Sequence, residues 1–228
     1  MPDWQMLNSV DHAALRLSRS GDGERHFAQI VADEFLKAAP YYPILFTKYP
    51  DTGAFYAGVV MGLEPGRNLM TATGRLSDYR PADLERQGFF IADGQVVIDR
   101  DHPVFAAGEG QALFEPTGEA APALRRVQQA LHVLDQGIPA TDAVIRRFLD
   151  HGLLEPIDVS MQFDDGRHLR LDGLYTVSLD ALHALSDAAA LTLFRNGDLQ
   201  LAYAQTGSVR HLRTLGRIHN DRLAAAAL

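Results

Sequence analysis

Residues 31–70 read VADEFLKAAPYYPILFTKYPDTGAFYAGVVMGLEPGRNLM, and this stretch decides the fold. Two runs rich in β-branched and aromatic residues, 44–49 and 55–63, flank the sequence Pro50-Asp51-Thr52-Gly53. Val, Ile, Phe and Tyr favour a pleated, half-buried strand, whereas Pro, Asp and Gly are typical of a tight turn. The pattern therefore predicts an antiparallel hairpin.

The second strand of this hairpin has one thin face. Side chains alternate between the two faces of a strand, so one face carries Tyr56, Gly58, Val60 and Gly62. Glycine inside a strand weakens it unless something approaches the backbone closely. We therefore expect a helix to cross over Gly58 and Gly62, or alternatively a ligand.

Upstream of the hairpin, apolar residues recur at helical spacing. Over residues 24–39 this spacing predicts an amphipathic helix whose buried stripe is Phe27, Ile30, Val31, Phe35 and Ala38. Pro40 and Pro43 are expected to end the helix, because proline lacks the N–H that a helix needs. Glu34 follows Phe27 by about two helical turns. Its carboxylate is therefore predicted to be buried.

A buried carboxylate needs partners. Ionisation without them in a low-dielectric interior costs several kcal/mol, so the group must accept hydrogen bonds or take up a proton. One interpretation of Glu34 is a structural tie to loop amides or to an arginine. The other is a carboxylate that faces a ligand or acts as an acid and base.

Three further residues are candidate companions of Glu34. Arg67 and Asn68 stand at the end of the hairpin, and Tyr79 follows a short way downstream. Arg67 could neutralise Glu34, or both could grip a carboxylate or amide of a ligand through charge-assisted hydrogen bonds. Asn68 could instead cap its own turn. We predict Glu34, Arg67, Asn68 and Tyr79 as ligand-binding residues, with no catalytic and no metal-binding residue.

The rest of the chain supplies further elements. The patterns predict a short helix after Pro81, a third strand at 95–99, a helical hairpin from stripes at 124–134 and 144–149, and a second strand hairpin at 157–163 and 169–177. Gly137 is expected to end the first helix of the helical hairpin, and Thr141 to cap the second. Ser178 and Ser186 are expected to cap two helices, before a last strand at 199–204 and a final helix from residue 208.

These elements predict an α+β fold. An antiparallel sheet built from two or more hairpins is expected to pack with the helical hairpin and the additional helices. The length of 228 residues suggests a single domain over 1–228, with a possible subdivision into 1–120 and 121–228.

Composition excludes several classes of function. The formal net charge of −8 and the lack of any basic run argue against a nucleic-acid partner, which needs a basic footprint. Cysteine is absent, so disulfides, thiol nucleophiles and zinc–thiolate sites are excluded. The run Asp99-Arg100-Asp101-His102 has metal-ligand residue types, but a solvated strand end explains it more simply. We expect no cofactor.

The N-terminal sequence MPDWQMLNSVDH has no basic region followed by an apolar one. A signal peptide is therefore not expected, and no apolar run in the sequence is long enough for a spanning helix. The expected location is the cytoplasm.

Several short motifs follow one another in order along nearly the whole chain. They are Glu34-Phe35, Tyr42-Pro43-Ile44, Phe46, Gly62-Leu63, Asn68-Leu69, Tyr79-Arg80-Pro81, Phe89, Asp99, Gly110, Leu113-Phe114, Gly118-Glu119, Leu153-Leu154-Glu155-Pro156 and Gly173-Leu174-Tyr175. In this order and spacing the chain resembles the SapC family of bacterial proteins, which is named after surface-layer loci. Two positions depart from the family pattern: Leu76 stands where a Trp is expected, and Gly88-Phe89 replaces Pro-Phe.

The resemblance implies an accessory or binding role in modifying a peptide or small molecule, because relatives lie beside genes for halogenase-like, oxygenase and receptor proteins. We predict a non-catalytic protein that binds a peptide, a small molecule or a partner enzyme. Two alternatives stay open. One is an enzyme that modifies such a molecule with Glu34 as acid and base; the other is a structural protein of the surface layer that forms homo-oligomers.

Overall fold

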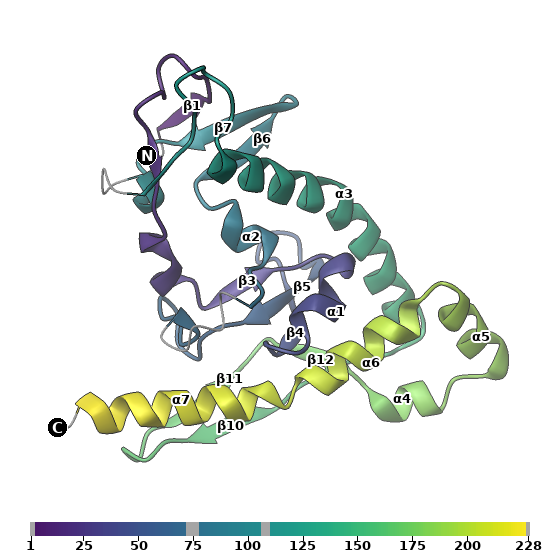
Figure 1. Ribbon diagram of the computed structural model, residues 1–228. Coiled ribbons are helices and arrows are strands. Elements are labelled where there is room, and N and C mark those ends of the chain that lie inside the picture. The colour runs from purple at the N-terminus through teal and green to yellow at the C-terminus, as the bar shows by residue number, and fades with distance from the viewer. Residues whose placement is uncertain (1–2, 72–77, 106–109, 227–228) are drawn as a thin grey trace.

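The computed structural model describes residues 3–71, 78–105 and 110–226. Leu76, one of the two departures from the family pattern, lies outside these ranges. Several antiparallel sheets combine with helices in the described residues, which confirms the predicted α+β fold (Figure 1).

The central sheet has five strands among the described residues, all antiparallel. Their order is β3 (Phe27–Gln29), β5 (Phe55–Val60), β4 (Ile44–Lys48), β12 (Tyr175–Val177) and β9 (Leu154–Pro156). The β4 and β5 strands form the hairpin predicted around the Pro50-Asp51-Thr52-Gly53 turn, with Phe46 opposite Ala57. This prediction is confirmed.

Smaller sheets surround the central one. A three-stranded sheet has the order β1 (Trp4–Met6), β7 (Gln95–Asp99) and β6 (Phe89–Ala92); β2 (Arg16–Leu17) pairs with β8 (Gln111–Ala112), and β10 (Val159–Gln162) pairs with β11 (His168–Leu171). The third strand and the second strand hairpin were predicted correctly. The chain turns at Gly173, however, where φ is 75°, so that β12 leaves the hairpin and joins the central sheet.

The helices are mostly short. They are α1 (Phe35–Ala38), α2 (Ala82–Glu85), α3 (Pro122–Asp150), α4 (Leu179–His183), α5 (Asp187–Arg195), α6 (Asp198–Ser208) and α7 (His211–Ala226), with 3₁₀ turns at Ser20–Glu24, Ala32–Glu34 and Pro103–Phe105. The side chains of Ser178 and Ser186 accept hydrogen bonds from Ala181 N–H and Ala189 N–H, as expected of N-caps. None of the helices in the described residues has both the length and the apolar composition needed to cross a membrane.

The helix predicted over 24–39 is wrong. The chain instead forms β3, the 3₁₀ turn Ala32–Glu34 and the single turn α1. The β5 strand holds this segment as an edge strand, with Phe27 opposite Val60, and the N–H groups of Met61 and Gly62 just after β5 both donate to His26 O. Pairing with a distant strand overrides the local periodicity, because it satisfies backbone groups along the edge of the sheet.

The predicted helical hairpin is also wrong, because α3 is one helix of 29 residues that follows a curved path past the sheet (Figure 1). Gly137 does not end it. A Cβ there would lie 2.6 Å from the side chain of Val31, so glycine serves close packing. Thr141 lies inside the helix and not at its start: its hydroxyl donates to Gly137 O (2.6 Å) and accepts from Ala32 N–H (2.8 Å).

The last strand, predicted over 199–204, is part of α6. The buried side chain of Gln205 explains why a helix is preferred here: its Nε2 donates to Ile44 O (2.8 Å) and its Oε1 accepts from Val177 N–H (2.9 Å). Ser208 Oγ accepts from Ile44 N–H (2.9 Å). Residues three apart share one face of a helix, so both side chains reach Ile44 at the start of β4. The final helix is confirmed as α7, beginning at His211.

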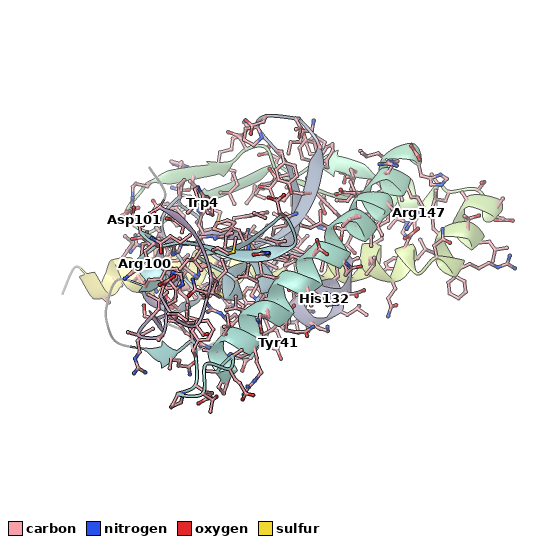
Figure 2. The ribbon with its side chains drawn as sticks, turned by 90° about the horizontal axis from the view of Figure 1, so that it is seen from above. Trp4, Tyr41, Arg100, Asp101, His132 and Arg147 are labelled. Carbon is pink, nitrogen blue, oxygen red and sulfur yellow. The ribbon has the colours of Figure 1, made fainter. Side chains whose placement is uncertain are left out.

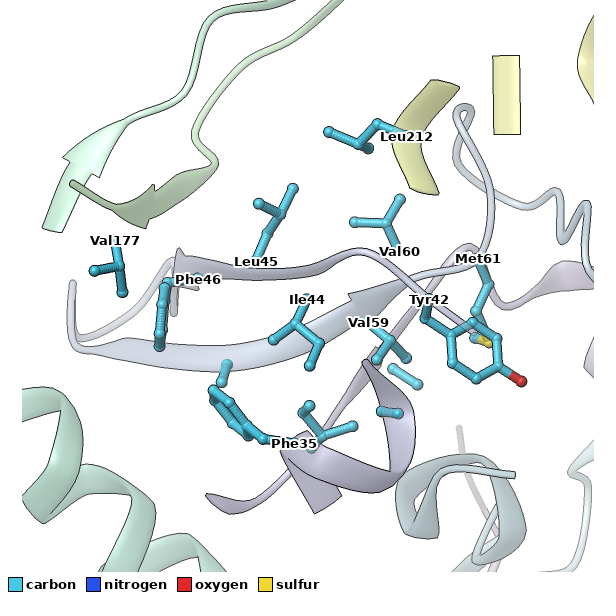
Figure 3. Packing of buried hydrophobic residues seen from close by; sticks show 14 of the residues in the cluster. Phe35, Tyr42, Ile44, Leu45, Phe46, Val59, Val60, Met61, Val177 and Leu212 are labelled. Carbon is cyan, nitrogen blue, oxygen red and sulfur yellow. The ribbon is translucent and has the colours of Figure 1, made fainter. Parts of the chain in front are cut away.

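Both faces of the central sheet are covered near its middle. On one face Phe46 packs between Phe35 of α1 and Phe148 of α3, at ring-centroid distances of 6.3 and 6.2 Å. On the other face Leu45 and Val60 point toward Leu212 of α7 (Figure 3). The second face is the one whose thinness was noted in the sequence.

A helix was expected to cross the thin face at Gly58 and Gly62, but other groups lie against these two glycines. A Cβ at Gly58 would lie 2.1 Å from the ring of Phe27, and one at Gly62 would lie 1.7 Å from the carbonyl oxygen of Arg67. Glycine is required because a neighbouring ring and a turn carbonyl press against the strand.

Candidate functional site

Glu34 is buried, as predicted, with 2% of its surface exposed. Its Oε1 accepts hydrogen bonds from Tyr79 O–H (2.6 Å) and Ala82 N–H (2.9 Å), and its Oε2 accepts one from Val31 N–H (3.0 Å). The carboxylate therefore joins three parts of the chain: the residue before its own 3₁₀ turn, the loop at Tyr79 and the first turn of α2.

Burial governs the charge of this group. Desolvation raises the pKa of the Glu34 carboxyl, and the hydrogen bonds from Tyr79, Ala82 and Val31 partly offset that rise. Burial and the nearby Glu34 carboxylate raise the pKa of Tyr79 far above its ordinary value. Tyr79 therefore keeps its proton and donates a hydrogen bond to Glu34.

Arg67 and Asn68 do not reach Glu34. The side chain of Arg67 is 42% exposed and lies 3.5 Å from Glu64. Asn68 is buried; its Nδ2 donates to Asp22 O (2.9 Å) and its Oδ1 accepts from Met70 N–H (2.8 Å), which is the turn-capping alternative. Of the four predicted ligand-binding residues, the structure brings Glu34 and Tyr79 into contact and leaves the other two apart.

Two charged clusters lie beside Glu34. In the first, Arg80 pairs with Asp22 at 2.6 and 2.8 Å and with Glu85 at 2.6 Å. In the second, Asp83 of α2 accepts hydrogen bonds from Arg25, from Arg86 (2.6 Å) and from Gln29 N–H (3.2 Å). Because two guanidinium groups share one carboxylate, the second cluster carries one net positive charge.

The second cluster forms one wall of a cleft of about 620 Å³ over the thin face of the central sheet. The cleft floor is made by side chains that share this face: Phe27, Gln29, Thr47, Tyr49 and Tyr56. The other wall comes from β11 and the residues after it, including Arg170 and Asp172. We call this cavity the sheet cleft.

Aromatic rings dominate the floor of the sheet cleft. Tyr49 and Tyr56 are stacked, with ring centroids 4.2 Å apart and planes inclined by 19°, and Phe27 meets Tyr56 edge to face at 5.8 Å. Gln29 Nε2 donates to the hydroxyl of Tyr49 (2.8 Å). Burial raises the pKa of Tyr49 and of Tyr56, so both hydroxyls remain protonated at neutral pH.

None of the four predicted residues lines the sheet cleft. Glu34 holds Ala82 N–H at the start of α2, one residue before Asp83, which is in the wall. The sequence did contain a signal for the floor, because Tyr56 stands among glycines on the thin face. From the sequence, the same signal predicts a crossing helix or, alternatively, a ligand.

Metal-ligand geometry does not arise in the described residues: within 3–71, 78–105 and 110–226, no three His, Asp or Glu side chains converge on one point. Figure 2 shows Arg100 and Asp101 at the end of the molecule where Trp4 lies, away from Arg147. Arg100 and Asp101 directly follow β7, and Asp99, the last residue of β7, pairs with Trp4 of β1.

The comparisons with known proteins give one family. The family model for SapC matches residues 7–215. The chain belongs to the SapC family. The SapC match spans the whole sheet cleft, from Arg25 to Leu174, and includes Glu34 and Tyr79. No curated protein and no solved structure gives a significant match to this SapC-family chain.

Proposed function

We propose that this SapC-family protein is a non-catalytic binding protein that holds a small molecule or a peptide in the sheet cleft. The observation that carries the proposal is the cleft itself: about 620 Å³, floored by stacked tyrosines and walled by a charged cluster. Ligand sites in proteins commonly have this volume and this combination of apolar surface with a few placed polar groups.

The lining indicates the chemistry of the ligand. A flat apolar group would pack against the rings of Tyr49 and Tyr56, since aromatic faces favour offset stacking. An acidic group would lie toward Arg25 and Arg86, whose shared partner Asp83 leaves the cluster with one net positive charge. In this proposal the protein is an accessory to an enzyme that modifies the bound molecule.

Glu34 and Tyr79 take a positioning role in this proposal. The contact from Glu34 to Ala82 N–H fixes the start of α2, and α2 carries the wall residue Asp83. An acid–base role would require a substrate to reach the Glu34 carboxylate. Its 2% exposure and its three hydrogen bonds support positioning instead.

Mass spectrometry of co-purifying molecules tests the binding proposal. The protein is purified under native conditions, and the small molecules and peptides released on denaturation are compared with those from the double variant Tyr49→Leu/Tyr56→Leu. Tyr203→Leu is the matched control, because Tyr203 is an exposed tyrosine of α6 remote from the cleft lining. We expect a compound that is present in the wild type and the control and lost from the double variant.

The opposite pattern would refute the sheet cleft as the site. A compound retained by the double variant at the wild-type level, with both proteins folded by circular dichroism, places binding elsewhere.

A further inference from the structure

A second cavity, of about 840 Å³, lies between the β10 strand and helix α7, which run beside one another in Figure 1. Its strand side is the unbroken segment 157–163, and its helix side includes Val209, Leu212 and three arginines. We call this cavity the β10 groove. It is separate from the sheet cleft, and the proposed ligand site does not use it.

The β10 groove runs along a strand edge. Successive side chains of a strand point to opposite faces, so a cavity that touches all seven residues from 157 to 163 must follow the edge of the strand. Within the part of the chain that the structure describes, β10 pairs with β11 alone. The other edge of β10 therefore has no strand beside it there.

The hydrogen-bond phase of β10 shows which backbone groups face the groove. Phe163 N–H donates to Arg167 O on the β11 side (2.9 Å). In an antiparallel ladder, alternate residues turn both backbone groups toward the partner strand. Ser160 and Gln162, three residues and one residue before Phe163, therefore turn their N–H and C=O groups away from β11, toward the groove. These are the groups that an added strand would bind.

The helix side of the groove is basic. Arg210, directly before α7, and Arg213 and Arg217 of α7 are all exposed and line the groove. The spacing of four residues places Arg213 and Arg217 on one face of α7, at a rise of about 6 Å. Among the described residues, none of the three forms an ion pair with an acidic side chain. The one acidic residue of the lining, Asp158, lies 3.8 Å from Arg170 instead.

The floor of the groove is apolar. Val159 is buried, and Leu212 is 5% exposed. Met161 approaches α7 where Gly216 leaves room: a Cβ at Gly216 would lie 3.6 Å from its sulfur. An open strand edge thus combines with an apolar floor and a row of unpaired positive charges.

We propose that the β10 groove binds an extended acidic segment of a partner protein, which adds as a strand to β10. Main-chain groups of the segment bond to Ser160 and Gln162. Residues that point to the same face of a strand recur about every 6.7 Å, close to the rise between Arg213 and Arg217. The segment therefore carries acidic residues at alternate positions, facing the arginines.

A second copy of the chain is the less suitable occupant. Pairing of two identical edges about a two-fold axis brings the same surface of both copies together. Each copy would then add Arg210, Arg213 and Arg217 to the same seam, and like charges oppose that contact. An acidic partner neutralises the row instead.

Fluorescence anisotropy with the full chain tests the proposal. The probe is a fluorescein-labelled peptide, Thr-Glu-Val-Glu-Val-Glu-Thr, and the comparison peptide has lysine at each glutamate. We expect saturable binding of the glutamate peptide alone. The variant Arg213→Glu/Arg217→Glu should weaken it by about tenfold or more, since two attractive contacts become repulsive. Arg146→Glu, at an exposed arginine of α3, is the control and should leave the affinity within about twofold.

The strand-addition step is tested separately at Ser160. Ser160→Pro removes the N–H that faces the groove and leaves the ladder with β11 intact, since proline is tolerated at a strand edge. We expect this variant to stay folded by circular dichroism and to lose the peptide, whereas Ser160→Thr, which keeps the N–H, should bind it as the wild type does.

Three results would overturn the proposal. The first is no saturable binding of the glutamate peptide up to millimolar concentration. The second is an unchanged affinity, either when the lysine peptide replaces the glutamate peptide or when folded Ser160→Pro replaces the wild type. The third is a dimer in light scattering that Ser160→Pro dissociates, which would assign the edge to a second copy. Each readout is independent of the tyrosines that test the sheet cleft.

Discussion

The carboxylate of Glu34 is held in the interior by neutral donors alone among the residues described. It has three hydrogen-bond donors, from Val31, Tyr79 and Ala82, and no cation is bonded to it among the described residues. Desolvation still dominates, because its pKa is raised. Each donor therefore contributes to keeping an ionised group in the interior.

Tyr79→Phe is expected to destabilise the fold by about 1.5–3 kcal/mol at pH 7.5, since it deletes a hydrogen bond to a charged group. The deletion raises the folded-state pKa of Glu34 further. Ionised Glu34 is the form that loses a donor, so the destabilisation is present above that pKa and shrinks as pH falls through it. Urea unfolding at pH 7.5 and pH 5 measures both effects. Tyr203→Phe is the control; a loss that is equal at both pH values would contradict the prediction.

Residue patterns could predict part of this region. Glu34 was expected to be buried because apolar residues surround it at regular spacing, and it is buried although it lies in a 3₁₀ turn before the single turn α1. The partnership with Arg67 was not realised, because Arg67 lies on an exposed turn beside Glu64. Tyr49 and Tyr56 come together across the hairpin, and their alternation alone does not tell a cleft from a covered face.

At the scale of elements, helix α3 shows how a distant contact changes the meaning of a residue. Gly137 and Pro139 normally indicate a helix end, yet α3 continues through both. Val31, which occupies the space a Cβ would need at Gly137, belongs to the N-terminal part of the chain. No local pattern around 137 reports that contact. In the same way, residues 199–204 are predicted as a strand but belong to α6, whose Gln205 bonds to Ile44, 161 residues away.

Gly137→Ala is expected to destabilise the protein, although alanine is the better helix former by about 1 kcal/mol. The new Cβ would lie 2.6 Å from the branched side chain of Val31, and overpacking of this kind costs about 1–3 kcal/mol. Gly207→Ala in α6 is the matched change, because no atom lies within 4 Å of its Cβ position. Thermal unfolding should show a lower midpoint for the first variant and an equal or higher one for the second. The reverse order would refute the packing argument.

At the scale of the whole molecule, the central sheet takes strands from both parts of the sequence. β3, β5 and β4 come from residues before 121, and β12 and β9 come from residues after it. Side chains cross between the parts as well: Thr141 bonds to Ala32 N–H, and Ser208 bonds to Ile44 N–H. These contacts support a single domain over 1–228 and weigh against the subdivision at 120, which stays a prediction.

The chain is therefore expected to unfold in one cooperative transition. Trp4 is the only tryptophan and lies in the small N-terminal sheet, with its ring 4.6 Å from that of Phe90. Its fluorescence reports on that sheet, while far-UV circular dichroism reports mainly on helices such as α3 and α7. The two probes should give coincident urea curves. Curves that separate by more than their error would show two independent units.

The open edge of β10 also affects how the molecule stays dispersed in solution. A strand without a neighbour is a template for cross-β stacking, and natural proteins guard such edges with charge. Arg210, Arg213 and Arg217 stand beside this edge and repel a like surface. Dissolved ions screen exposed charges over about 10 Å at 0.1 M ionic strength and about 3 Å at 1 M. Concentrated salt would weaken this protection and favour aggregation of the chain through β10.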